Sequence, residues 1–385
     1  MIITEIILFL AVLRLDSGFA QKKGKALMKI FDSYQQKELF LASLQIWRPR
    51  KKFKTKLLFC YKDYLYDHSL NSLILYFKMN YANIDFIGFS REECPRENLG
   101  LSSIKLLKKI GEFKPNVVFT NEKILSAAEI DHVLGLGINL ITSTCGYSSF
   151  DYGGMSQTEA IENLAKYALY LVPHAPHVPK LRSVGIHAVE FPFWFEPTWF
   201  HPIKKEKVFD VLFVGDFTTP LNKNRLELLE LLSKNYKVAV ASDQNTLLPN
   251  VHHLGATTNP HKLNEWINLS RITIGSDRLA EKKSLNDTPG GHLFMYDDKY
   301  FIRQRTYLTM GAGACYLVER HGEIEKKFLD GEEIILWDHY QDLVDKVKYL
   351  LRNNVERDSI GSKAAVKSLA EHATSVRVNQ LVQMI

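Results

Sequence analysis

Short runs of Val, Ile, Leu and Phe alternate with longer amphipathic stretches along most of the chain, from residue 57 to the C-terminus. Short apolar runs are typical of strands that are buried on both faces, and apolar positions three or four residues apart are typical of helices. Strands that alternate with helices in this way form a parallel sheet with helices on both faces. The pattern therefore predicts an α/β fold.

The first group of predicted elements forms one Rossmann-like domain, to which we assign residues 57–187. Its predicted strands are 57–61, 84–89, 117–120, 138–143 and 169–172, and its predicted helices are 69–77, 102–110, 122–134 and 157–167. Residues 188–204, AVEFPFWFEPTWFHPIK, then interrupt the alternation with three prolines and a group of aromatic side chains. Proline fixes φ and removes a backbone donor, and the aromatic rings need a surface to cover, so we predict an extended interdomain linker.

The alternation resumes after the linker and predicts a second Rossmann-like domain over residues 205–385. Its predicted strands are 210–215, 236–241, 272–274 and 315–318, and its predicted helices are 224–232, 261–269, 305–310 and 340–351. Two such domains joined by an aromatic linker predict a ligand cleft between them, at the carboxyl ends of the strands.

Charge is distributed unevenly along the 385 residues, whose length alone suits two domains of about 100–200 residues each. The net charge is +6, yet residues 22–56 alone carry eleven Lys and Arg against Asp32 and Glu38. We treat residues 1–56 as a basic N-terminal arm, which is a candidate for peripheral contact with an anionic membrane or nucleic acid and is equally typical of a solvated helix and linker. The rest of the chain has no basic stripe with interleaved aromatics, which argues against nucleic acid as a partner of the two domains.

The cysteines and the N-terminus bear on the compartment. Four cysteines lie far apart without a C-x-x-C pair, and two of them fall in predicted strands, which favours reduced thiols in a cytoplasmic protein. Residues 6–13 and 17–20 resemble the apolar region and cleavage site of a signal peptide. However, the first five residues contain Glu5 and no Lys or Arg, and the apolar run is shorter than the about 20 residues that span a bilayer. We therefore expect an amphipathic or buried start rather than secretion.

Residues 305–338, RTYLTMGAGACYLVERHGEIEKKFLDGEEIILWD, contain the most specific pattern in the chain. A short helix begins at Arg305, and its first turn offers backbone N–H groups and a positive dipole end to phosphate oxygens. Arg303 and Arg305 add guanidinium groups suited to a diphosphate, and Gly311 and Gly313 permit a tight turn and a close approach of backbone to ligand. From spacing alone, an ordinary helix-to-strand turn with a surface arginine explains the same pattern.

The pattern R-x-[FY]-x-x-x-x-x-G-A-x-x-L, followed by the acidic segment 328–333, resembles CgeB-like glycosyltransferases, relatives of the group 1 (GT4-like) enzymes. The resemblance extends over roughly residues 185–385 and includes FDVLFVG, Arg225 and the linker. It implies the GT-B fold, a nucleoside-diphosphate sugar donor such as a UDP-sugar, and metal-independent transfer. It also implies that Arg305 opens the donor-site helix, that Gly313 is the family glycine and that Tyr307 takes the aromatic position.

One position departs from the family. A glutamate that commonly follows the aromatic residue, and that is thought to hold the nucleotide ribose, is replaced by Leu308. Leucine accepts no hydrogen bonds from ribose hydroxyls. Either another residue such as Glu319 makes this contact, or the donor differs, or the site has lost its activity.

Several further residues are candidates for the site. Gly215 and Asp216 end a predicted strand, and Arg225 opens the following helix, where it either reaches a phosphate or is an ordinary solvated side chain. Asp151, in the loop 146–154, is a candidate general base toward an acceptor hydroxyl or a turn-forming residue. His174 and His177 are candidates for acceptor binding or idle loop residues. The polar segment 275–303 is predicted to be a lid or an insertion.

The predicted function is transfer of a sugar from a nucleoside-diphosphate sugar to an acceptor hydroxyl of a polysaccharide, glycolipid or protein. Arg305, the helix start and Arg225 would neutralise the leaving diphosphate. The sequence contains no D-x-D triplet, no Walker motif and no G-x-G-x-x-G. It therefore shows no residues typical of a metal-bound diphosphate site, of an ATPase or of a dinucleotide-binding enzyme. A sugar-nucleotide epimerase and a non-catalytic sugar-nucleotide-binding or assembly protein remain as alternatives.

Overall fold

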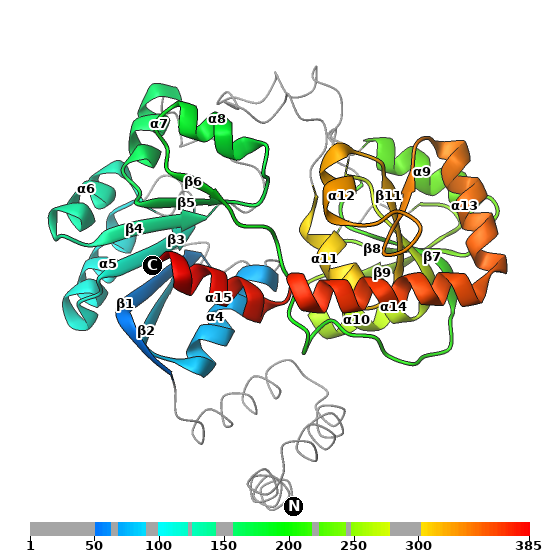
Figure 1. The fold of residues 1–385 in the computed structure, drawn as a ribbon, viewed down its shortest axis with the longest axis horizontal. Helices are drawn as coiled ribbons and strands as arrows, with labels where there is room; N and C mark the ends of the chain where they lie inside the picture. Colours follow the sequence, from blue (N-terminus) through cyan, green and yellow to red (C-terminus); the bar gives the residue numbers. More distant parts are fainter. Residues whose placement is uncertain are drawn as a thin grey trace, which may run out of the picture. The chain divides into compact units, whose positions relative to one another are not determined.

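A computed structural model describes residues 51–62, 68–89, 99–121, 125–143, 157–217, 223–243, 248–277 and 302–385. These residues contain two six-stranded sheets with helices on their faces (Figure 1). Both sheets lie in one compact unit that covers residues 52–385. The predicted α/β class is confirmed.

The first sheet has the strand order β2-β1-β3-β4-β5-β6, and the pairs from β1 through β3, β4 and β5 to β6 are parallel. Its strands are β1 (Lys51–Lys62), β2 (Tyr81–Phe89), β3 (Val117–Asn121), β4 (Asn139–Ser143), β5 (Leu169–Val172) and β6 (Ala188–Glu190). Its helices are α4 (His68–Asn80), α5 (Leu99–Phe113), α6 (Ala127–Gly135), α7 (Gln157–Ala165) and α8 (His177–Ser183).

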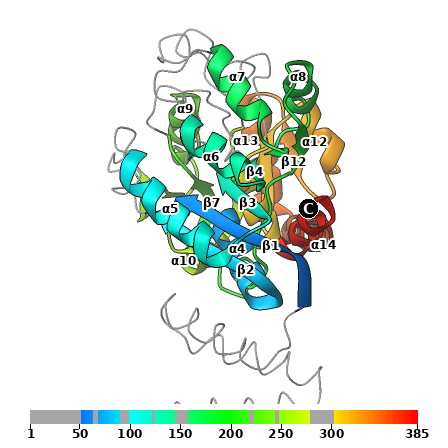
Figure 2. The same ribbon diagram turned by 90° about the vertical axis from the view of Figure 1, so that its left-hand side faces the viewer.

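Alternate residues of these strands feed two separate apolar layers, as expected for strands buried on both faces. Leu58 and Val118 pack with α5, α6, α7 and α8 on one face. Phe59 and Phe119 pack on the other face with α4 and with the C-terminal helix α15 (Thr374–Met384). Figure 2 shows α5, α6 and α7 along the side of the first sheet that carries the first layer.

The second sheet has the order β12-β11-β10-β7-β8-β9, and all of its neighbouring strands are parallel. Its strands are β7 (Phe209–Val214), β8 (Val238–Ala241), β9 (Val251–Gly255), β10 (Ser270–Ile274), β11 (Cys315–Glu319) and β12 (Ile335–Trp337). Its helices are α9 (Lys223–Ser233), α10 (Pro260–Asn268), α11 (Gln304–Gly311), α12 (Gly322–Lys327), α13 (Tyr340–Arg352) and α14 (Asn354–Glu371). One apolar layer lies under α9 and α13, and another joins β11 and β12 to α11, α12 and α14.

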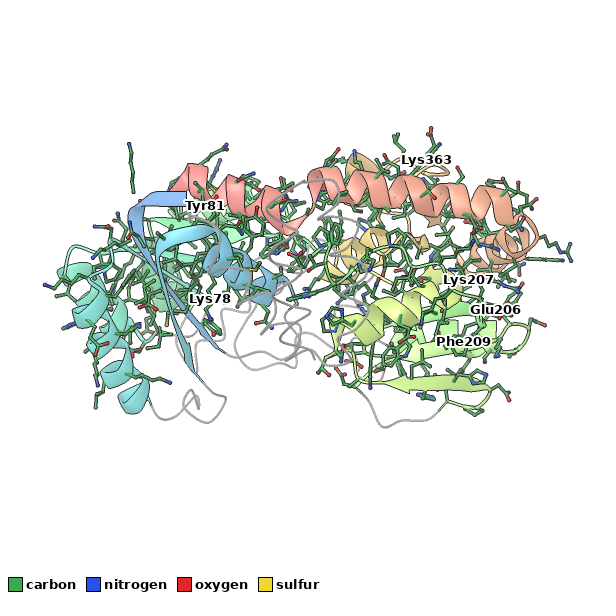
Figure 3. All side chains as sticks on the ribbon, turned by 90° about the horizontal axis from the view of Figure 1, so that it is seen from below. Lys78, Tyr81, Glu206, Lys207, Phe209 and Lys363 are labelled. Atoms are coloured by element: carbon green, nitrogen blue, oxygen red, sulfur yellow. The ribbon has the colours of Figure 1, made fainter. Side chains whose placement is uncertain are left out.

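The entry into β7 is fastened to the start of β10. Lys207, which Figure 3 labels beside Glu206 and Phe209, donates from Nζ to the Asn268 carbonyl at 2.9 Å, and the Val208 amide donates to the Leu269 carbonyl at 2.7 Å. Burial lowers the pKa of the Lys207 ammonium. These bonds set the two strands in register at the amino end of the sheet.

The segment after β6 runs extended along the start of the C-terminal helix, as the prolines predict. The Phe195 amide donates to the His372 carbonyl at 3.1 Å, and the Thr374 amide donates back to the Phe195 carbonyl at 2.9 Å. The Trp194 indole donates to the Ser72 hydroxyl at 3.1 Å, which ties the segment to α4. The aromatic side chains of this segment are therefore covered by helices of the protein.

The C-terminal helix packs against the first sheet, although the predicted boundary at residue 205 assigns it to the second domain. α15 packs against α4, and its Val378 and Leu381 lie in the apolar layer of the first sheet. The predicted boundary at residue 205 assigned residues 374–384 to the second domain with the residues before them, because apolar spacing does not identify the sheet that a segment covers. By packing, residues 374–384 belong with the first sheet.

Most predicted elements are found within a few residues of their predicted ends, and the predicted strand 169–172 coincides with β5. The elements that were not predicted are β6, β9, β12, α8, α12, α14 and α15. No helix in the described ranges combines the length and the apolar character that a bilayer span requires.

Candidate functional site

The order of the strands in the second sheet creates a switch point between β7 and β10. From β7 the chain runs outward through β8 and β9 to one edge, then returns to place β10 on the other side of β7 (Figure 1). In an open α/β sheet, ligands bind outside the carboxyl ends of the strands at such a point. Residues 215–217 and 275–277 follow β7 and β10 at this place.

Arg225 joins the two segments at the switch point. Its side chain is 1% exposed, Nη1 donates to the Asp216 carbonyl at 2.7 Å, and Nη2 donates to the Ser276 carbonyl at 3.2 Å. The Ser276 hydroxyl in turn donates to Oε2 of Glu319, the last residue of β11, at 3.0 Å. The carboxyl ends of β7, β10 and β11 are therefore linked through one guanidinium and one hydroxyl.

Arg305 reaches the same place from α11. Its Nη1 donates to the Val214 carbonyl, and its guanidinium carbon lies 5.6 Å from the centroid of the Phe213 ring. Gly215 makes room for it, because a Cβ at this position would lie 2.4 Å from Arg305 Nη1, and the backbone φ of +128° is itself one that favours glycine. A guanidinium is thus fixed over the end of β7 by the absence of a side chain at residue 215.

Arg303 lies at the N-cap position of α11, where no side chain of the described residues caps the helix. Its Nε is 3.9 Å from Oδ1 of Asp277, and Nε2 of His321 is 3.6 Å from Oδ2 of the same carboxylate. Asp277 is fully buried. Three arginines that meet beside the positive end of a helix form a setting that suits an anionic ligand with several oxygens.

The predicted site residues divide into two groups. The structure brings six of them together at the carboxyl edge of β7, β10 and β11: Gly215, Asp216, Arg225, Arg303, Arg305 and Glu319. Asp277 and His321 belong to this place and were not predicted. For Asp277 the available signal was a charged residue three positions after a buried strand, at the position that corresponds by register to Asp216 after β7.

Tyr307 and Gly311 in α11, and Gly313 in the turn after it, pack against the linker and the C-terminal helices. The Tyr307 ring is buried, 4.7 Å from the His372 ring, and burial raises the pKa of its hydroxyl. A Cβ at residue 311 would lie 2.4 Å from the Phe195 ring, and one at residue 313 would lie 2.7 Å from Pro202. In this structure the three residues allow the linker to pack closely on α11.

Other candidates are only partly described. Asp151 and the loop 146–154 lie outside the described residues, as do residues 278–301 of the predicted lid. His174 and His177 are buried beyond the end of β5, with their rings 5.4 Å apart. Leu308, at the position of the family glutamate, is buried in α11.

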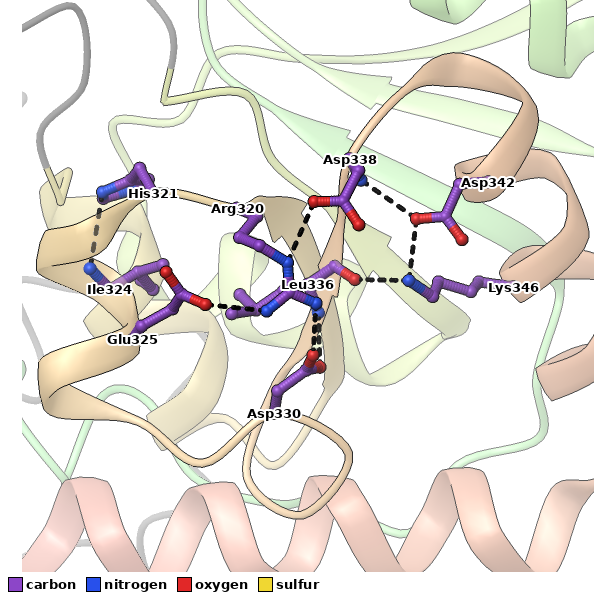
Figure 4. Close-up of polar contacts among 9 residues, drawn as sticks. All are labelled: Arg320, His321, Ile324, Glu325, Asp330, Leu336, Asp338, Asp342 and Lys346. Carbon is purple, nitrogen blue, oxygen red and sulfur yellow. Dashed lines mark hydrogen bonds and ion pairs between the residues drawn. The ribbon is translucent and has the colours of Figure 1, made fainter.

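The acidic segment after β11 folds around a single arginine (Figure 4). Arg320 donates to Glu325, Asp330 and Asp338 over 2.6–2.9 Å, and these carboxylates raise the pKa of its guanidinium. The second oxygen of Asp330 accepts the Leu336 amide at 2.9 Å. The carboxylates of this segment therefore stabilise the turn between α12 and β12.

Among the residues that the structure describes, no three His, Cys, Asp or Glu side chains are grouped as they would be to hold a metal ion.

A family model described as glycosyl transferase-like matches residues 217–383. This match agrees with the predicted glycosyltransferase class over a domain that contains Arg225, Asp277, Arg303, Arg305 and Glu319. The finer CgeB-like assignment stays a prediction. No curated protein matches the chain.

Solved structures with the same fold extend over both sheets. Sucrose-phosphate synthase from Thermosynechococcus elongatus superposes with a TM-score of 0.59 at 10% identity, covering 85% of this chain and 98% of that one. HepE from Anabaena, in complex with UDP and glucose, gives 0.58 at 12% identity over 86% and 98%. UDP-GlcNAc 2-epimerase from Neisseria meningitidis, bound to UDP-GlcNAc, gives 0.50 at 12% identity over 86% and 100%. The predicted GT-B fold is confirmed.

Proposed function

We propose that this protein transfers a sugar from a nucleoside-diphosphate sugar, most simply a UDP-sugar, to an acceptor hydroxyl. The observation that carries the proposal is the convergence of Arg225, Arg303 and Arg305 at the β7–β10 switch point beside the start of α11. The glycosyl transferase-like match over residues 217–383 supports the same reaction class. HepE, which shares the fold, has been solved in complex with UDP and glucose.

The chemistry required of the site is stabilisation of a leaving group. The acceptor oxygen forms a bond to the anomeric carbon while the bond from that carbon to the diphosphate oxygen breaks, and the diphosphate leaves with the electron pair. Guanidinium groups and helix N–H groups that already face this oxygen lower the energy of the developing charge without reorganising. In our proposal Arg305 and Arg303 contact the diphosphate, and this arginine charge supports transfer without a metal. Arg225 holds the two loops at the correct separation.

The acceptor side rests on residues outside the described ranges. Asp151 is proposed as the general base that takes the acceptor proton. We also propose that Glu319, buried at the end of β11 and bonded to Ser276, takes over the ribose contact that Leu308 lacks.

A cytoplasmic location with peripheral membrane contact through residues 22–56 remains part of the proposal. The buried free thiol of Cys315 supports that location.

The proposal is tested with Arg305→Met, compared with Arg271→Met. Arg271 lies at the opposite end of β10, is 44% exposed and pairs with Asp210 at 3.2 Å, so it matches Arg305 in charge while lying away from the switch point. A charged hydrogen bond is worth about 1.5–3 kcal/mol, so Arg305→Met is expected to weaken UDP binding roughly 10–100-fold by calorimetry. Arg271→Met is expected to bind UDP as the wild type does. Equal affinity of Arg305→Met and wild type would refute the proposed site.

A second measurement separates the transferase from two alternatives, an epimerase and a non-catalytic sugar-nucleotide-binding protein. The fold shared with UDP-GlcNAc 2-epimerase favours the first alternative, and Leu308 favours the second. Wild-type protein is incubated with UDP-, GDP- and dTDP-sugars, with and without acceptor sugars and lipids. A transferase releases nucleotide in an acceptor-dependent way, an epimerase isomerises the donor without acceptor, and a non-catalytic protein gives only a thermal shift.

A further inference from the structure

Asp277 is a buried carboxylate at the centre of the proposed site. It follows β10 by three residues, and its side chain is 0% exposed. Neither of its oxygens has a hydrogen-bond partner among the residues that the structure describes. A buried charge without compensation costs several kcal/mol, so its two neighbours at 3.6 and 3.9 Å determine what this carboxylate does.

The first neighbour, His321, presents a proton to Asp277. His321 caps α12, because its Nδ1 accepts the Ile324 amide at 3.4 Å. In a neutral ring with Nδ1 as the acceptor, the proton lies on Nε2, and this is the atom that faces Oδ2 of Asp277. Asp277 is therefore the carboxylate that faces the side chain at the start of α12.

The second neighbour, Arg303, is a cation at the N-cap of α11, where the helix dipole is already positive. This placement is unfavourable unless an anion lies close by. Asp277 supplies that anion on the Nε side of the guanidinium, at 3.9 Å. The arginine side chain is 13% exposed, so only a small part of it remains open to a ligand.

We infer that Asp277 is a positioning residue of the donor site, which holds the Nε edge of Arg303 and so determines which part of the guanidinium faces the diphosphate. The inference rests on the proposed function. It adds a residue that acts through Arg303, at the point where β10 meets the first residues of α11 and α12. Its effect on binding is specific to the phosphates of the ligand, because Arg303 is the neighbour of Asp277 that we place against the diphosphate.

The test is a double-mutant cycle of Asp277→Asn and Arg303→Met, with the dissociation constants for UDP and for uridine as readouts. We expect Asp277→Asn to weaken UDP binding about tenfold and to leave uridine binding unchanged. In the Arg303→Met background, Asp277→Asn is expected to change UDP affinity less than about twofold, because the side chain through which it acts is gone. A purely structural role would instead affect UDP and uridine alike and in both backgrounds.

The matched control is the pair Asp210 and Arg271 at the other end of the sheet, which lie 3.2 Å apart. Asp210→Asn and Arg271→Met are expected to leave both affinities unchanged. If Asp277→Asn does not fold, Arg303→Lys keeps the charge but lacks the Nε–H that faces Asp277, and it should show the same tenfold loss. Additive effects in the cycle, or wild-type UDP affinity in Asp277→Asn or Arg303→Lys, would overturn the inference alone. A wild-type chain that binds none of UDP, GDP and dTDP would overturn the proposed function together with it.

Discussion

His372 is a buried imidazole whose surroundings prevent it from taking up a proton. Its Nδ1 accepts from Nη2 of Arg377 at 2.8 Å, and the Tyr307 and Phe328 rings lie 4.7 and 5.6 Å from its own. Burial, and then the Arg377 charge, lower its pKa to about 3. The folded protein therefore keeps this ring neutral at pH values where the unfolded chain protonates it.

This difference predicts how stability depends on pH. Below about pH 6.5 the unfolded state binds one more proton at residue 372 than the folded state, so stability falls as the pH drops toward 3. His372→Gln keeps an amide oxygen for Arg377 and does not titrate. From about pH 7.5 to about pH 5, wild type should lose about 2 kcal/mol more stability than the variant in urea unfolding. Parallel losses in the two proteins would contradict the depressed pKa.

Part of the site could be predicted from the sequence, namely the residues that lie at the ends of predicted strands and helices. Arg225, Arg305 and Gly215 stand at the ends of predicted elements, so their meeting at one sheet edge follows from the parallel order. Asp277 and His321 were missed because their meeting depends on the separation of two loops after different strands. Tyr307 is a residue type that often contacts ligands. Its burial under His372 depends on how α14 and α15 pack, which its own sequence neighbourhood does not reveal.

At the scale of elements, α14 crosses the turn between α11 and β11 at a point where neither side has a side chain. A Cβ on Gly361 would lie 2.3 Å from the Gly313 carbonyl oxygen and 3.2 Å from the Ala314 carbonyl carbon. Both neighbours are backbone atoms, which move only if the helix or the turn moves. Close contact between α14 and this turn therefore depends on the glycine at residue 361.

Gly361→Ala should destabilise the protein by about 1–3 kcal/mol, because the added methyl group pushes α14 away from this turn. Gly322→Ala, also in a helix, is the matched control, since nothing lies within 4 Å of its added Cβ. The control should be neutral or more stable by up to about 1 kcal/mol. Thermal and urea unfolding measure both, and equal stabilities for the two variants would contradict the close packing.

Elements with strong apolar patterns were predicted well, and those with weak patterns were not. α13 was predicted as 340–351 and spans Tyr340–Arg352, because its leucines and valines repeat at helical spacing. The buried face of α14 includes Gly361, Ala364 and Ser368, and small residues of this kind produce little hydrophobic periodicity. β6 and β12 are three residues long, too short for any alternation to be recognised.

At the scale of the whole molecule, the C-terminal helix completes the layer of the first sheet. Leu381 and Val378 of α15 are fully buried in that layer with Leu73 and Phe77 of α4. The Thr55 hydroxyl also donates to the Ile385 carbonyl at 3.3 Å, which joins the last residue to β1. Stability of the first sheet is thus expected to depend on residues at the far end of the chain.

Leu381→Ala should reduce the free energy of unfolding by about 2–5 kcal/mol, the usual cost of truncating a buried leucine. Val366→Ala on α14 is the control, since Val366 is 70% exposed and its truncation should cost less than about 0.5 kcal/mol. The fluorescence of Trp194, whose indole is bonded to Ser72, reports on the same layer during unfolding. A loss for Leu381→Ala no larger than that of the control would refute the packing of α15 on α4.

The bond between Thr374 and Ser72 joins residues 302 positions apart in the chain. During synthesis on a ribosome, α4 emerges long before the helix that covers it. At about 5–20 residues per second, the wait is roughly 15–60 s. Throughout that interval the part of this layer that α15 covers is exposed, so the nascent chain is expected to bind chaperones that recognise exposed hydrophobic surface until α15 has been synthesised.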